Sequence, residues 1–119
     1  WNESSILIIQ IESITAVENI EALLQFEEVD GVLIGPYDLS GSLGVPGDIY
    51  NDKVKDAVNV VYDKCRKYGK SCGPHEVAPT ISSVKDSFKA GSSFVVLASD
   101  VFILSQWGEN MQELISVCR

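Results

Sequence analysis

The chain has 119 residues, of which 45% are hydrophobic and 22% charged, and its formal net charge is −8. This composition is typical of a single globular domain over residues 1–119 and excludes a disordered chain. A charge this negative repels phosphate backbones and anionic lipids, so we expect neither nucleic acid nor a membrane as a partner. No apolar run approaches the ~20 residues that span a bilayer, and the first residues do not resemble a signal peptide, so we expect a cytoplasmic protein.

Four times along the chain, a short apolar run is followed by a turn and then by a segment with helical periodicity. The first run, Ile6–Ile11, is continuous and β-branched, as expected of a strand buried on both faces. Behind it, Thr15–Glu18 has the form of a capping box and predicts the start of a helix. The buried face of that helix is predicted to consist of Val17, Ile20, Leu23 and Leu24.

The second unit has a predicted strand at 31–35, a long loop containing glycine and proline at 36–51, and a helix that ends at Gly69. Apolar residues recur in that helix at steps of three and four, which predicts one buried face made of Val54, Ala57, Val58, Val61 and Cys65.

The third and fourth units are predicted in the same way. A short strand at 71–73 precedes a loop marked by Pro74 and Pro79, and a helix follows from about Thr80 to Gly91 with Ile81, Val84 and Phe88 facing inward. The fourth strand is predicted at 94–98. The closing helix is predicted to bury one stripe, formed by Leu104, Trp107, Met111, Leu114, Ile115 and Cys118.

This alternation predicts the α/β class with a parallel sheet and right-handed crossovers. One possible architecture is an open four-stranded sheet with helices on both faces. The other is half of a TIM (β/α)8 barrel, because a complete barrel needs about 250 residues. Half a barrel exposes interior positions such as Ile8 and Val96 and leaves sheet edges unpaired. We therefore expect a segment of a longer enzyme or a chain that pairs with another copy or with a partner.

The residues that follow each strand are the candidates for chemistry, because ligands bind at the carboxyl ends of parallel strands. Glu12 and Asp38 follow the first two strands, and neighbouring strands lie about 4.8 Å apart, so both carboxylates could bind one Mg²⁺ or Mn²⁺ ion. The alternative is that Glu12 only favours a helix start and Asp38 only caps a turn.

Two further features lie at these strand ends. In the segment 35–40, the turn could direct the amides of Tyr37 and Asp38 toward a carboxylate, or it could be an ordinary β–α turn. His75, the single histidine, follows the third strand. It is a candidate catalytic residue for substrate contact or water positioning, and the alternative is a loop histidine bonded to a backbone carbonyl.

Three strings together resemble a known family. Gln10-Ile11-Glu12, the segment 30–40 continued by Ser42-Leu43-Gly44, and the segment 95–104 are similar to motifs of the HpcH/HpaI family of metal-dependent (class II) pyruvate aldolases. The resemblance covers essentially the whole chain. It implies the last four βα units of a TIM barrel, the C-terminal half of a pyruvate-aldolase-like enzyme.

The resemblance also implies roles for individual residues. Glu12 and Asp38 would bind the divalent metal (Mg²⁺ or Mn²⁺, with Co²⁺ as a further candidate), Gln10 would contact bound pyruvate, and the amides of Tyr37 and Asp38 would receive its carboxylate. The implied reaction makes or cleaves carbon–carbon bonds between a 2-oxo acid and an aldehyde through a pyruvate enolate. The family's arginine and proton-transferring histidine lie in its N-terminal half, so we expect this chain alone to be far slower than a completed barrel.

Two other classes of function were weighed against this lyase. A non-catalytic half-barrel binding or assembly module would keep the same sheet and a vestigial carboxylate site. A small flavodoxin-like domain that binds a nucleotide is disfavoured, because Gln10-Ile11-Glu12-Ser13 places an acid where a glycine-rich phosphate loop would be needed.

Overall fold

A computed structural model describes residues 4–118 as an elongated molecule with extents of 60 × 37 × 23 Å. Its four strands are parallel and follow one another across the sheet in chain order: β1 (Ile8–Ile11), β2 (Gly31–Ile34), β3 (Ser71–Glu76) and β4 (Val96–Leu97). The predicted α/β class and parallel sheet are confirmed. Consecutive neighbours in a parallel sheet are the arrangement expected of successive units of a barrel wall.

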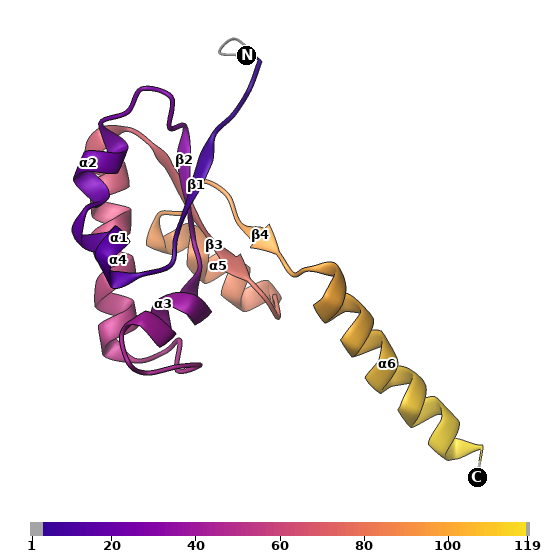
Figure 1. Cartoon of the computed structure of the whole chain (residues 1–119). Coiled ribbons are helices and arrows are strands. Elements are labelled where there is room, and N and C mark those ends of the chain that lie inside the picture. The colour runs from indigo at the N-terminus through magenta and orange to yellow at the C-terminus, as the bar shows by residue number, and fades with distance from the viewer. Residues whose placement is uncertain (1–3, 119) are drawn as a thin grey trace.

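Among the described residues, six helices follow these strands, two each after β1 and β2 and one each after β3 and β4 (Figure 1). They are α1 (Ile14–Glu18), α2 (Ile20–Leu24), α3 (Pro36–Ser42), α4 (Asp52–Tyr68), α5 (Ile81–Ala90) and α6 (Asp100–Val117). In the described part of the chain, no helix is both long enough and apolar enough to cross a bilayer.

One hydrophobic core lies between one face of the sheet and the helices α1 to α4. The strands contribute every second residue, with Ile11, Val32, Ile34 and Cys72 buried. The helices contribute Val17, Ile20, Leu24, Leu39, Val54, Ala57, Val61, Tyr62 and Cys65. The predicted buried faces of the first two helical segments are therefore confirmed, with Val58 and Leu23 partly buried at their margins.

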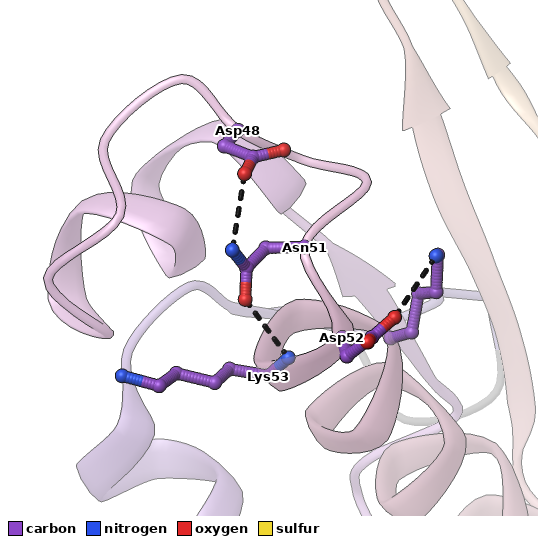
Figure 2. Close-up of polar contacts among 5 residues, drawn as sticks. Asp48, Asn51, Asp52 and Lys53 are labelled. Carbon is purple, nitrogen blue, oxygen red and sulfur yellow. Dashed lines mark hydrogen bonds and ion pairs between the residues drawn. The ribbon is translucent and has the colours of Figure 1, made fainter.

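Helix α4 begins and ends where its sequence signals place it. Asn51 caps the start, since its side-chain carbonyl accepts a hydrogen bond from the Lys53 amide at 3.1 Å while its amide group donates to Asp48 at 3.0 Å (Figure 2). Gly69 ends the helix with a φ of 66°, in the left-handed region that glycine adopts without strain.

The start of the first helical segment differs from the prediction. The N-cap is Ser13, whose hydroxyl accepts a hydrogen bond from the Ala16 amide at 3.2 Å, so the predicted capping box at Thr15–Glu18 is wrong. The segment is also interrupted at Asn19, whose side-chain amide donates to the Thr15 carbonyl at 2.8 Å. Such local bonding by asparagine competes with the backbone pattern of a helix, and two short helices result.

Two further boundaries are corrected. The predicted loop at 36–51 contains helix α3, which has Pro36 in its first turn, a position where the missing N–H of proline costs nothing. The third strand was predicted to end before Pro74, but β3 continues to Glu76. Only His75 and Glu76 pair with β4, so Pro74 lies where that side of β3 has no paired neighbour, and proline is tolerated there.

The predicted burial of the last two helices is wrong. In α5, Ile81 is 79% exposed and Phe88 50% exposed, whereas Val84 is partly buried, and in α6 Trp107 is 61% exposed. Met111 is only partly buried, and the other residues of the predicted stripe are exposed: Leu104, Leu114, Ile115 and Cys118. Figure 1 shows the reason, because α6 extends away from the sheet and from the other helices.

The second face of the sheet is open. Ile8 is 45% exposed and Val96 37% exposed, as expected for the interior positions of half a barrel. The prediction that Ile6–Ile11 is buried on both faces is consequently wrong, since the described helices that form the core cover only the opposite face.

Candidate functional site

The strand register brings three of the relevant positions into one row. Ile11, Ile34 and Pro74 are partners across β1, β2 and β3, so the next residues along, Glu12, Gly35 and His75, follow at the same level. Side chains alternate along a strand, which places Glu12, two residues after Gln10, on the open face opposite the core. The carboxyl ends of three adjacent strands thus meet at one edge of the sheet.

Gln10, Glu12 and Gly35 form the closest contacts at this edge. The Gln10 side-chain amide donates a hydrogen bond to the Glu12 carboxylate at 2.8 Å. A Cβ atom at Gly35 would lie 2.9 Å from the Gln10 nitrogen and 3.5 Å from a Glu12 oxygen. A larger residue at position 35 would displace the Gln10 and Glu12 side chains from this arrangement, so glycine suits the position, and its backbone just after β2 forms one wall of the site.

Asp38 and Tyr37 lie in the first turn of α3, directly after β2. Both side chains are exposed. First-turn amides have no partner within their own helix, so the amides of Tyr37 and Asp38 are available to an acceptor. Asp38 thus lies shortly after the end of β2, and Glu12 lies directly after the end of the neighbouring strand β1.

His75 is held against the neighbouring strand. Its Nε2 atom lies 3.0 Å from the Ala98 carbonyl oxygen, which can only accept, so Nε2 carries the proton. This bond agrees with the alternative interpretation of His75, a histidine bonded to a backbone carbonyl. Ala98 also donates its amide to the Glu76 carbonyl at 2.7 Å and has a φ of 54°, so both of its backbone groups are fixed by β3. The role of His75 toward a substrate stays a prediction.

The two carboxylates fit a hard divalent cation in their chemistry. Mg²⁺ and Mn²⁺ prefer oxygen ligands, and Mg²⁺ usually binds through one or two carboxylates while it keeps several waters. Glu12 and Asp38 supply two such groups, both reachable from solvent. Among residues 4–118, no group of three or more acidic, histidine or cysteine side chains is placed to hold a metal. An ion here would keep most of its coordination positions for water or substrate.

A groove of about 650 Å³ lies beside this edge, between the end of β3, α4 and α5. It includes Tyr37 and His75 but neither Glu12 nor Asp38. The candidate site is therefore an open surface at the strand ends, as expected where a barrel wall is seen without the opposite wall.

The sequence interpretation missed two contributions. It assigned Gly35 to turn formation, whereas the close approach of Gln10 and Glu12 is a further reason for glycine there. It also gave no role to Ser42, whose hydroxyl accepts a hydrogen bond from the Ile14 amide at 2.9 Å. No local sequence pattern indicates this contact, because it joins residues 28 positions apart.

Comparison with known proteins finds aldolases with similar sequences and similar structures. A 2-keto-3-deoxy-L-rhamnonate aldolase of Salmonella dublin is 36% identical over 105 residues, covering 88% of this chain and 39% of that protein. The crystal structure of an HpcH/HpaI aldolase from Desulfitobacterium hafniense DCB-2 superposes with a TM-score of 0.86 at 28% identity, covering 96% of this chain and 44% of the other. An HpcH/HpaI aldolase/citrate lyase family protein from Burkholderia cenocepacia J2315 gives 0.84 at 24% identity, which supports the fold alone.

These matches confirm the predicted fold as consecutive βα units of a TIM-type barrel wall. The chain spans less than half the length of the relatives it matches. The family model described as HpcH/HpaI aldolase/citrate lyase matches residues 1–106. The chain belongs to the HpcH/HpaI aldolase/citrate lyase family.

Proposed function

We propose that this chain carries the metal-binding and oxo-acid-binding part of a divalent-metal-dependent aldolase, a carbon–carbon lyase acting on 2-oxo acids. The observation that carries the proposal is the arrangement of Glu12 and Asp38 at the ends of adjacent parallel strands, with Gln10 bonded to Glu12, in a chain of this family. The relatives named 2-keto-3-deoxy-L-rhamnonate aldolase support an aldol-type cleavage.

In this proposal, Glu12 and Asp38 bind Mg²⁺, Mn²⁺ or Co²⁺. When bound, such a cation would polarise the ketone of a 2-oxo acid and favour negative charge on its oxygen. Gln10 fixes the direction of the Glu12 carboxylate through the 2.8 Å hydrogen bond and contacts the substrate. The first-turn amides of Tyr37 and Asp38 receive the substrate carboxylate, which the partial positive charge of such amides favours.

The substrates proposed are pyruvate, or another 2-oxo acid, and an aldehyde. His75 is the candidate for contact with the substrate or for positioning a water from β3. Its Nε2–H is used by Ala98, so Nδ1 is the ring atom left to accept a hydrogen bond. We further propose that the chain is cytoplasmic. We also propose that it assembles into a homo-oligomer, because an open sheet face and an exposed apolar helix are costly in water.

A non-catalytic half-barrel binding or assembly module remains the second candidate. The observation that favours it is the large exposed apolar area on α6 and on the open sheet face, which suits a protein interface. The two candidates differ in whether the carboxylates bind a metal and in whether a completed barrel activates pyruvate.

Metal titration tests the first candidate directly. We expect calorimetry to show one Mn²⁺ ion bound per chain. Glu12→Ala and Asp38→Ala should each weaken Mn²⁺ binding roughly tenfold or more, since each variant leaves a single carboxylate for the ion. Glu18→Ala is the control, because it removes an exposed carboxylate from the end of α1. If both site variants bind Mn²⁺ as tightly as the parent, the assignment of the ligands is wrong.

The chemistry is tested with a longer protein that also contains the first four βα units. It should exchange the methyl protons of pyruvate for deuterium only with a divalent cation present, as followed by proton NMR. Exchange that survives a chelator would contradict metal-dependent catalysis. Metal binding without any exchange would favour the non-catalytic module.

A further inference from the structure

A side-chain hydrogen bond joins the turn after β1 to the helix after β2. Helix α1 begins at Ile14, and its cap Ser13 accepts from the Ala16 amide, which leaves the Ile14 amide without a local acceptor. That amide instead donates to the hydroxyl of Ser42 at 2.9 Å, 28 positions further along the chain. Ser42 thus caps a helix to which it does not belong.

Ser42 and Asp38 lie on the same short helix, α3. Ser40, in the same helix, is completely buried, and its hydroxyl donates to the Tyr37 carbonyl at 2.6 Å and accepts from the Gly47 amide at 2.9 Å. The first turn of α3, which carries Asp38, is therefore tied by a side-chain bond to the later part of the same helix. A constraint applied at Ser42 acts on the position of Asp38.

The strand ladder alone does not fix this geometry. Its last bond, from the Gly35 amide to the Ile11 carbonyl at 3.1 Å, holds the two strand ends together. Glu12 and Asp38 both lie beyond that bond, on segments that leave the sheet. The Ser42 hydroxyl joins those segments at a second point, so the two bonds together set how the Glu12 turn faces the start of α3.

We propose that Ser42 is a positioning residue for the Glu12 and Asp38 carboxylates: its hydrogen bond to the Ile14 amide fixes their separation. The inference rests on the proposed function, since it takes these two side chains as the metal ligands. With only two protein ligands, a site depends strongly on their spacing, and residues that hold ligands in place commonly alter metal affinity by about 10- to 100-fold when they are replaced.

Ser42 is also the residue at which positioning can be separated from folding. Ser40 is buried and its hydroxyl has two partners, the Tyr37 carbonyl and the Gly47 amide, so Ser40→Ala would remove two hydrogen bonds at once and could unfold the segment. Ser42 is exposed, so water can replace its hydroxyl as the acceptor for Ile14 without restoring the link to α3.

The test compares Ser42→Ala with Ser42→Thr, which keeps the hydroxyl, in the full chain. Ser116→Ala is the matched control, because the Ser116 hydroxyl donates only within its own helix, to the Glu113 carbonyl at 2.6 Å. We expect Ser42→Ala to weaken Mn²⁺ binding about tenfold in calorimetry, Ser42→Thr to stay close to the parent, and Ser116→Ala to have no effect. Hydrogen exchange of the Ile14 amide should accelerate only in Ser42→Ala.

The results distinguish a failure of the inference from a failure of the proposed function. If the Ile14 amide exchanges at the same rate in Ser42→Ala and the parent, the link does not exist and the inference is overturned. If exchange accelerates while Mn²⁺ affinity is unchanged, Ser42 has only a structural role, and the metal site stands without it. If the parent binds no Mn²⁺ while its Ile14 amide is protected, the proposed function fails and the inference fails with it.

Discussion

Two regions of this chain carry similar apolar patterns and reach opposite outcomes. From β1 to β3, the strands and helices α1 to α4 share one core, and α4 alone buries Val54, Ala57, Val61, Tyr62 and Cys65. From α5 onward, none of the described residues of α5, β4 or α6 is buried. Helix α6 is the longest helix of the described chain, yet its apolar residues face solvent.

The difference shows that the spacing of apolar residues specifies which face of a helix can be buried. Whether that face is buried depends on a second element that packs against it. Helix α4 packs against strands β2 and β3 and helices α1, α2 and α3, all of which belong to the same chain segment. Between β4 and α6, Ala98 has a φ of 54°, and α6 extends away from the sheet (Figure 1). The described residues therefore offer no surface that covers its apolar residues.

One substitution in each region tests this difference most directly. Leu24, in α2, is 1% exposed, and Leu104, in α6, is 68% exposed. Leu24→Ala should lower the free energy of unfolding by about 2–5 kcal/mol, because it removes buried methyl groups and leaves a cavity. Leu104→Ala should change it by less than ~0.5 kcal/mol. Urea unfolding followed by circular dichroism measures both.

Protein concentration is the control for that pair. If Leu104→Ala becomes as destabilising as Leu24→Ala when the concentration is raised, and light scattering then shows a dimer or larger, α6 is buried between copies. If Leu104→Ala is equally destabilising in a dispersed monomer, the separation of the two regions drawn here is wrong.

Much of the packed region could be predicted because its signals are local. The β-branched run that ends at Ile11 and the stop at Gly69 are read within a few residues, and strand ends locate Glu12 and Asp38. The unpacked region could not be predicted in this way. Periodicity reports the apolar stripe around Trp107 but not the partner that would cover it, and tertiary context decides burial.

The same division applies to the candidate site. The two carboxylates could be proposed as ligands because parallel strands place their ends together, whereas the bond between Ser42 and Ile14 joins residues 28 positions apart and has no local signature. Likewise, the extension of β3 through Pro74 depends on how little of β3 pairs with β4, which is a property of the sheet and not of the third segment alone.

The second prediction concerns the junction between the regions. A Cβ atom at Gly73 would lie 1.9 Å from the Phe94 carbonyl oxygen, and a backbone atom cannot move away without shifting the whole segment before β4. Gly73→Ala should therefore cost about 1–3 kcal/mol and separate β4 from β3. Hydrogen exchange should accelerate at the Ser93 and Ala98 amides, which bond to β3 carbonyls.

Gly108→Ala, in α6, is the matched control. Nothing lies within 4 Å of a Cβ atom at that position, so alanine should stabilise the helix by about 0.5–1 kcal/mol through its higher helix propensity. If Gly73→Ala leaves the Ser93 and Ala98 amides as protected as in the parent, β3 and β4 do not approach as closely as described, and the junction must be redrawn.

The smallest predicted effect is electrostatic and concerns the ion pairs of the two regions. In the packed region, Glu21 on α2 binds Lys64 at 2.6 Å and Lys67 at 3.0 Å on α4, whereas Lys89 and Asp86 form a pair within α5 alone. The hydrogen bond from Lys64, then that from Lys67, and the charges of both lysines lower the pKa of Glu21 from 4.5 to about 2. Only the first cluster joins two elements of the fold.

A pKa that is lower in the folded state stabilises the fold above the unfolded-state value and loses that contribution as the pH falls through the folded-state value. The parent should therefore lose melting temperature between about pH 4.5 and pH 2 more steeply than Glu21→Gln, which cannot titrate there. The difference should be modest and should shrink at high salt, because the cluster is exposed to solvent. Lys64→Gln combined with Lys67→Gln should flatten the acid limb in the same way, since it removes the cause of the shift. Identical acid limbs for the parent and Glu21→Gln would show that this cluster does not join α2 to α4 in solution, and the packed region would then depend on its apolar core alone.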